Sequence, residues 1–145
     1  MKKSIIGLGL VGMLFAGAAF AVSYVEQKPL KQVVTVPVGE VIATGKIPAG
    51  IITWGGDIVT VYCNGNAKST VKGSICDKQG VQLELFREDV FPKQLEMYMS
   101  GKTPFLRGTL GQIAQAVEVM AKDPRTEPVV FFKHTDSYGC DVLVV

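Results

Sequence analysis

The sequence predicts an α/β fold with a mostly parallel sheet. Two observations support this class: strand-like and helix-like runs alternate from residue 51 onward, and glycine-marked turns follow apolar runs. Alternation of this kind is typical of parallel strands joined by right-handed helical crossovers. Glycine-marked turns at the ends of such strands present backbone N–H groups to a small anion. We therefore expect a ligand-binding fold, and no group of residues resembles a catalytic centre.

The first 21 residues have the pattern of a secretory signal peptide. Two lysines precede an apolar stretch rich in glycine and alanine, and small residues stand at Ala19 and Ala21. The stretch is too short for a stable membrane anchor, so we expect cleavage after Ala21 and a secreted mature protein. The chain has 15 basic and 13 acidic side chains, so 13 of each remain when Lys2 and Lys3 are removed. This neutral balance argues against nucleic acid or an anionic membrane as the main partner.

The mature part of the chain has a length that suits one domain. Residues 22–45 alternate loosely between apolar and polar types and include Pro29 and Pro37. This pattern predicts an extended N-terminal arm. The domain itself is expected to span 46–145.

Local patterns predict each element in the first half of the domain. The β-branched residues before Trp54 predict a first core strand at 51–54, which follows a predicted turn from Gly45 to Gly50. After the glycines that break this strand, Asp57 is well placed as the N-cap of a helix over 58–65. Alternation of apolar and polar residues predicts a strand at 81–86.

The second half contains two helices with apolar residues at helical spacing. The first, at 91–99, offers Leu95, Met97 and Met99 for packing, and Gly101 ends it. Thr109 can cap the second helix, at 110–122, whose apolar positions are Ile113, Ala116, Val117 and Met120. Short strands are predicted at 105–107, 128–133 and 141–145. The strand at 128–133 is expected to be buried.

Three cysteines, Cys63, Cys76 and Cys140, belong to the mature part of the chain. Three cannot all pair within one chain, so at least one is a free thiol or an intermolecular link. Cys63 with Cys76 is the preferred disulfide, because these residues bracket a short polar excursion that contains glycine. The alternative is that all three are small buried apolar groups.

Five segments carry a resemblance to a known family: ITWGG, DKQGVQLELF, YMSGK, PFLRGT and GCDVLVV. In this order they resemble the N-terminal part of periplasmic solute-binding proteins of the nitrate, sulfonate and taurine type, which feed ABC importers. The resemblance covers about residues 46–145. It implies the N-terminal lobe of a type II periplasmic-binding fold: a single three-layer lobe with a mostly parallel, incomplete sheet. It also implies a periplasmic location, a small-molecule ligand, an importer permease as partner, no cofactor and no catalysis.

The resemblance places candidate ligand-binding residues at three strand ends. They are Trp54 with Gly55, Gly108 with Thr109, and Ser137 with Tyr138. Glycine lets a backbone approach a ligand closely, and Thr109 offers a hydroxyl and an N–H at a positive helix end.

Two charged residues join this candidate set. Arg107 is expected to make a charge-assisted contact to an oxyanion, and Asp57 to touch the ligand as well as cap its helix. The plainer alternatives are a salt-bridged Arg107, an Asp57 that only caps, and a Trp54 that packs at the rim of the core. His134 is the only histidine, and we expect a solvated residue at a strand end and no metal site.

Members of the family are considerably longer, and this chain stops just after the strand at 141–145. We therefore expect a truncated form whose sheet lacks the strand that returns from the second lobe. A rival hypothesis is a small disulfide-bonded periplasmic protein that binds other proteins through an exposed sheet edge and its arm. Neither the ligand nor the oligomeric state follows from the sequence.

Overall fold

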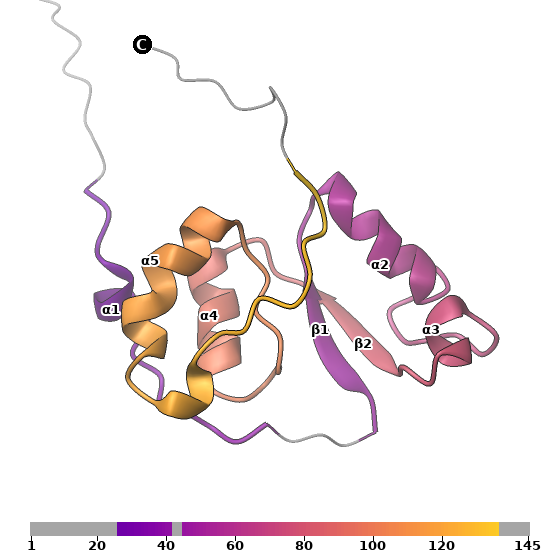
Figure 1. The fold of residues 1–145 in the computed structure, drawn as a ribbon, viewed down its shortest axis with the longest axis horizontal. Coiled ribbons are helices and arrows are strands. Elements are labelled where there is room, and N and C mark those ends of the chain that lie inside the picture. Colours follow the sequence, from indigo (N-terminus) through magenta and orange to yellow (C-terminus); the bar gives the residue numbers. More distant parts are fainter. Residues whose placement is uncertain (1–25, 42–44, 137–145) are drawn as a thin grey trace, which may run out of the picture.

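The structure of the protein, a computed structural model, describes residues 26–41 and 45–136. The predicted signal peptide and the predicted strand at 141–145 lie outside these residues. The elements occur in the order α1 (Leu30–Val33), β1 (Ile47–Ile51), the 3-10 helix η1 (Gly55–Asp57), α2 (Ile58–Cys63), α3 (Ile75–Lys78), β2 (Leu83–Arg87), α4 (Phe91–Met99), α5 (Leu110–Met120) and the 3-10 helix η2 (Pro124–Thr126). In Figure 1, α1, α4 and α5 lie to one side of the two strands, and α2 and α3 lie to the other.

β1 and β2 form a small open sheet and run parallel, in a register that pairs Ile47 with Leu83 and Ile51 with Arg87. The connection between them passes through η1, α2 and α3, since parallel strands need a long crossover. The structure thus confirms the prediction of a fold that combines helices with parallel strands. On the outer edge of β2, a single antiparallel bridge joins Ser69 to Glu84.

β1 begins four residues before the predicted strand at 51–54, and it ends three residues before the predicted end. The prediction treated the segment up to Gly50 as a turn, whereas Gly50 lies inside the strand. A Cβ atom on Gly50 would stand 3.2 Å from Cζ of Phe86 and 3.4 Å from Oε1 of Gln94. Gly50 therefore serves close packing against its neighbours, which is a common role of glycine within a strand.

The segment at 105–107 was predicted as a strand and forms none in the structure. One reason lies in β1, where Pro48 has no N–H to donate toward a further strand. Its carbonyl already accepts a hydrogen bond from the buried Thr103 hydroxyl at 2.8 Å. Residues 105–107 consequently run past β1 without joining it in a ladder.

The run at 128–133 was predicted as a buried strand, and this prediction is also wrong. Val129 is 83% exposed and Phe131 is 75% exposed. A continuous apolar run is buried in a parallel sheet only where strands flank it and helices cover it. Within the residues that the structure covers, no strand pairs with this segment.

The hydrophobic core lies between α4, α5 and the segment around α1. Its buried members are Val34, Phe91, Leu95, Met99, Ala116, Val119 and Met120. The helix predicted at 91–99 is confirmed at both ends, and the helix predicted at 110–122 is confirmed over Leu110–Met120. Within α5, Val119 is buried and Val117 is half exposed, contrary to the predicted packing face.

The described part of the predicted arm, 26–41, packs against the domain and contains α1. Val34 is 1% exposed, and Lys31 Nζ lies 2.8 Å from Glu118 Oε1 on α5. Further along, the Gly39 N–H donates to the Met99 carbonyl at the end of α4. This segment is therefore part of the core rather than an arm that precedes it.

Candidate functional site

The loops that follow β1 and β2 meet at the carboxyl end of the sheet. The backbone N–H and the hydroxyl of Thr53 donate to the carboxylate of Asp89, at 2.5 and 3.0 Å. These hydrogen bonds, with Arg87 nearby, lower the pKa of the Asp89 carboxyl. Open α/β sheets bind ligands at this end of their strands, so these loops are the expected position of a ligand site.

Asp57 ends η1 and is buried, with 2% of its surface exposed. It stands at the N-cap position of α2, but its side chain makes no capping hydrogen bond. Its Oδ2 instead accepts the Ile52 N–H at 2.8 Å, and its Oδ1 accepts from Nε of Arg107 at 2.7 Å. The predicted capping contact is therefore wrong, because the carboxylate is committed to a backbone donor and a distant guanidinium.

Arg107 lies in the extended segment before α5, and its side chain is 17% exposed. Its ion pair with Asp57 is the least exposed one in the part of the chain that the structure describes. Only Nε takes part in this pair, and neither Nη atom bonds to another described residue. The two Nη groups of such a fork are the donors that match a carboxylate or sulfonate oxygen pair.

Trp54, predicted to face the ligand, is half exposed beside this pair. Its carbonyl accepts the Asp57 N–H at 3.0 Å, and its indole Nε1–H donates to the Thr135 hydroxyl at 3.3 Å. Gly55 is exposed, and a Cβ atom there would meet nothing within 4 Å. The indole ring is thus positioned by the chain while part of its surface stays open to solvent.

Sequence reasoning missed the contribution of residues 134–135. Nδ1 of His134 lies 3.4 Å from Oδ1 of Asp57, and the ring is 4.9 Å from that of Phe132, edge to face. The Thr135 methyl packs so close to Gly56 that a Cβ atom there would stand 2.7 Å from it. No spacing rule links positions so far apart; the one available signal was that His134 is the only histidine.

Gly108 and Thr109 follow Arg107 in the chain. Gly108 serves close packing, and Thr109 caps α5. The Thr109 hydroxyl accepts the Gln112 N–H at 3.2 Å, and the Thr109 N–H donates to Oε1 of Gln112 at 2.9 Å, a complete capping box. At Gly108 a Cβ atom would stand 2.7 Å from the ring of Phe91. The N-cap prediction for Thr109 is confirmed, and the same bonds use both polar groups that were predicted to face a ligand. Ser137 and Tyr138 lie outside the described residues.

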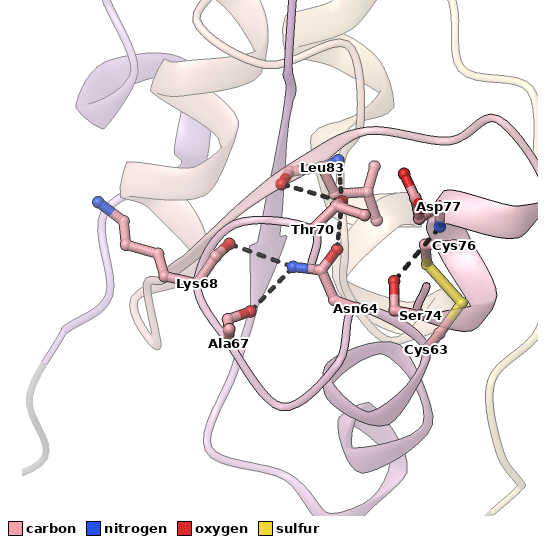
Figure 2. The surroundings of a disulfide bond; sticks show 9 residues. All are labelled: Cys63, Asn64, Ala67, Lys68, Thr70, Ser74, Cys76, Asp77 and Leu83. Carbon is pink, nitrogen blue, oxygen red and sulfur yellow. Dashed lines mark hydrogen bonds between the residues drawn. A yellow bond between two sulfur atoms is a disulfide. The ribbon is translucent and has the colours of Figure 1, made fainter. Parts of the chain in front are cut away.

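A disulfide joins Cys63 and Cys76 with a Cα–Cα distance of 5.3 Å, which confirms the predicted pair, and Figure 2 shows its surroundings. Cys140 lies outside the residues that the structure describes. Next to the bridge, the fully buried Asn64 donates from Nδ2 to the carbonyls of Ala67 and Lys68 and accepts at Oδ1 from the Thr70 hydroxyl.

The bridge fixes the end of α2 that lies away from the site. α2 begins directly after Asp57 and ends at Cys63, so Asp57 is at one end of a two-turn helix and the bridge at the other. At the bridge, the Ser74 hydroxyl caps α3 by accepting the Asp77 N–H at 3.3 Å. Hydrogen bonds from the Gly73 N–H and the Gln82 side chain lower the pKa of Asp77. Together these contacts hold the crossover between the strands in one conformation.

Two surface depressions occur elsewhere on the described part of the chain. One, of about 490 Å³, lies between the segment around α1, the first turn of α4 and one face of α5; the other, of about 300 Å³, lies between Gly39–Val41 and η2. Neither is lined by Trp54, Asp57 or Arg107. The residues described here also contain no cluster of three potential metal ligands, and none of their helices is long and apolar enough for a membrane span.

Comparison of the chain with protein-family models, with curated proteins and with solved structures finds no match. The structure brings Trp54, Gly55, Asp57 and Arg107 together and adds His134 and Thr135. It places Gly108 and Thr109 next to them in structural roles.

Proposed function

We propose that this protein binds a small anionic or zwitterionic solute at the carboxyl end of β1 and β2, without catalysis. In this proposal it is the periplasmic substrate-binding component, or one lobe of such a component, of an ABC importer. The observation that supports the proposal most is the Arg107 fork. Nε of Arg107 is held by the buried Asp57, and both Nη groups make no bond to other described residues.

The pairing with Asp57 prepares Arg107 for ligand recognition. A guanidinium held through Nε loses little further conformational freedom when its Nη groups bind an oxyanion. Asp57 itself is fixed by the Ile52 N–H, so the orientation of the fork is set by the backbone that follows β1. Trp54, whose carbonyl accepts the Asp57 N–H, has a half-exposed indole that supplies an apolar surface for the rest of the solute.

Neither of the two depressions described above is lined by Trp54, Asp57 or Arg107, and in this proposal one lobe offers an open surface to its ligand. Strong small-molecule sites bury most of the ligand's surface. We therefore expect weak binding by this lobe alone, with a dissociation constant of about 1 mM, which corresponds to about −4 kcal/mol. A second lobe or a second copy that closes over the site would strengthen binding.

Isothermal titration of the mature protein with nitrate, alkyl sulfonates and amino acids tests the proposal. We expect one class of these solutes to bind and the variant Arg107→Gln to lose that binding. Arg125→Gln is the matched control, because Arg125 pairs with Asp123 and Glu40 far from Trp54 in the chain and should leave binding unchanged. Thermal melts of both variants verify that they are folded. Absence of binding across the panel would sink the proposal.

A second candidate function is that of a disulfide-bonded periplasmic module that binds other proteins. It is favoured by the exposed apolar residues Ile58, Val59 and Tyr62 on α2 and by the exposed run at 129–132. Size-exclusion chromatography with thiol counting separates the two proposals. A stable oligomer with Cys140 protected would favour the interaction module, and a monomer with one free thiol would contradict it.

A further inference from the structure

We propose that His134 is a further residue of this site, and that the charge on its imidazole sets how strongly the site holds an anion. This inference rests on the proposed solute-binding function and deepens it. It starts from the contact between Nδ1 of His134 and Oδ1 of Asp57, at 3.4 Å. That oxygen is the same one that accepts from Nε of Arg107.

Three contacts place His134 there, so its position does not depend on the Asp57 contact alone. The neighbouring Thr135 hydroxyl accepts from the Trp54 indole, and the Thr135 methyl fits against Gly56, where no Cβ atom intervenes. On the other side, the ring of Phe131 lies 5.7 Å from that of Phe105, two residues before Arg107. The segment at 131–135 is therefore held against both stretches of chain that form the site.

Among the described residues, the charged side chains that contact this part of the site form two ion pairs, so their charges cancel when the ring is neutral. Asp57 from η1 and Arg107 from the segment before α5 form one pair. Within the segment of His134 itself, Lys133 and Asp136 form another, with Nζ and Oδ2 2.7 Å apart. The Phe132 ring packed on the imidazole carries no charge. Protonation of His134 thus changes the site from neutral to singly positive.

A site with one added positive charge attracts an anion more strongly. Histidine is the side chain whose charge ordinarily changes between about pH 5 and 8. One added unit charge near the Arg107 fork, partly screened by water, strengthens the binding of a monovalent anion by about tenfold. Anion affinity is therefore higher when His134 carries an imidazolium than when its ring is neutral.

The first test is titration with methanesulfonate, which keeps one negative charge throughout, at about pH 5.5 and about pH 8. For the mature protein we expect roughly tenfold tighter binding at the lower pH. His134→Gln should bind equally at both values, and Lys133→Gln, the control in the same segment, should keep the pH difference. Binding that is equal at both pH values in the unaltered protein overturns the inference and leaves the proposed function standing. No methanesulfonate binding at either value overturns the inference as well, and the proposed function falls with it only if nitrate and the amino acids of the panel also fail to bind.

The second test needs no ligand. It therefore tests the position of His134 whether or not methanesulfonate binds. The chain has one tryptophan and one histidine, so the fluorescence of Trp54 reports directly on the charge of a nearby His134. An imidazolium quenches indole emission at short range. We expect emission of the mature protein to fall in a single step from about pH 8 to about pH 5.5, and the step to vanish in His134→Gln. Emission that does not change with pH in the unaltered protein overturns the placement of His134 in the site.

Discussion

Asp57 and Arg107 are 50 residues apart in the sequence, and their side chains meet at 2.7 Å with exposures of 3% and 17%. Neither charge has much access to water, so each depends on the other. The pair also joins the two halves of the described chain, because Asp57 ends η1 and Arg107 precedes α5. Its geometry underlies both the proposed binding site and a measurable part of the stability.

Asp57→Ala is expected to lower the free energy of unfolding by about 3 kcal/mol, because it leaves the mostly buried Arg107 without a partner. It also leaves the Ile52 N–H without its acceptor. Urea denaturation followed by circular dichroism measures the change. Asp136→Ala is the control: it breaks an exposed pair with Lys133 and should cost less than about 1 kcal/mol. Equal losses in the two variants would contradict the buried role of Asp57.

The disulfide is expected to contribute about 3 kcal/mol, because it closes a short loop in the unfolded chain. Cys63 and Cys76 are separated by 13 positions. The double variant Cys63→Ser, Cys76→Ser should show this loss in urea denaturation. The unaltered protein unfolded in the presence of a reductant should match it. If the reductant leaves the denaturation midpoint unchanged, these two cysteines do not form the bridge in solution.

Two glycines close to Thr109 in the sequence, Gly108 and Gly111, give a matched pair of alanine substitutions. In Gly108→Ala the new Cβ would stand 2.7 Å from the buried Phe91 ring, and we expect a loss of about 1–3 kcal/mol through overpacking. In Gly111→Ala the nearest atom is 3.9 Å away, and the residue lies inside α5. There alanine should raise stability by about 0.5–1 kcal/mol, because it restricts the unfolded chain and favours the helix. Thermal melts that place both variants on the same side of the unaltered protein would argue against this packing.

Local signals predicted those elements whose determinants lie within a few residues. α4 has Pro92 in its first turn and apolar residues at helical spacing, and α5 opens on a complete capping box at Thr109. In both helices, the residues that mark the first turn in the sequence also stabilise that turn in the structure. The preferred Cys63–Cys76 pair was predictable for a similar reason, because the residues between them form one compact crossover.

Predictions failed where a distant partner decides the outcome. Gly50 was interpreted as a turn because its contacts with Phe86 and Gln94 are invisible in the local sequence. Asp57 was predicted to cap α2 with its side chain. Its carboxylate instead binds Arg107, and no periodic pattern in the sequence connects these two positions. The run at 128–133 has the composition of a buried strand, but burial depends on neighbouring strands that the composition of the run cannot supply.

Adjacent valines test whether the segment at 26–41 belongs to the core. Val34 is 1% exposed among the residues of α4 and α5, whereas Val33 is 41% exposed. Val34→Ala should cost about 1–3 kcal/mol, because it removes buried methyl groups and leaves a cavity. Val33→Ala should change the free energy of unfolding by less than about 0.5 kcal/mol. Similar values for the two variants would show that this segment does not pack on the domain in solution.

Four carboxylates predict how stability depends on pH. The pKa values of Asp77, Glu84, Asp89 and Asp123 are all lowered, chiefly by hydrogen bonds, and that of Asp123 reaches about 2 through its bonds with Arg125. A lowered pKa in the folded state means that the unfolded chain binds protons more readily. The stability from these groups is therefore complete above the ordinary values, 3.8 for Asp and 4.5 for Glu, and is lost as the pH falls through the lowered ones.

We accordingly expect the urea midpoint to stay level with respect to these groups above about pH 5 and to drop steadily between about pH 4.5 and pH 2. Asp123→Asn should reduce the drop at the lowest pH, because its carboxylate, held by Arg125, is the last of the four to take up a proton. The exposed Glu127→Gln serves as control, since this side chain makes no hydrogen bond or ion pair with another described residue and should leave the profile unchanged. A midpoint that rises as the pH falls from about 4.5 would reverse the sign of the argument and exclude these hydrogen bonds as the cause.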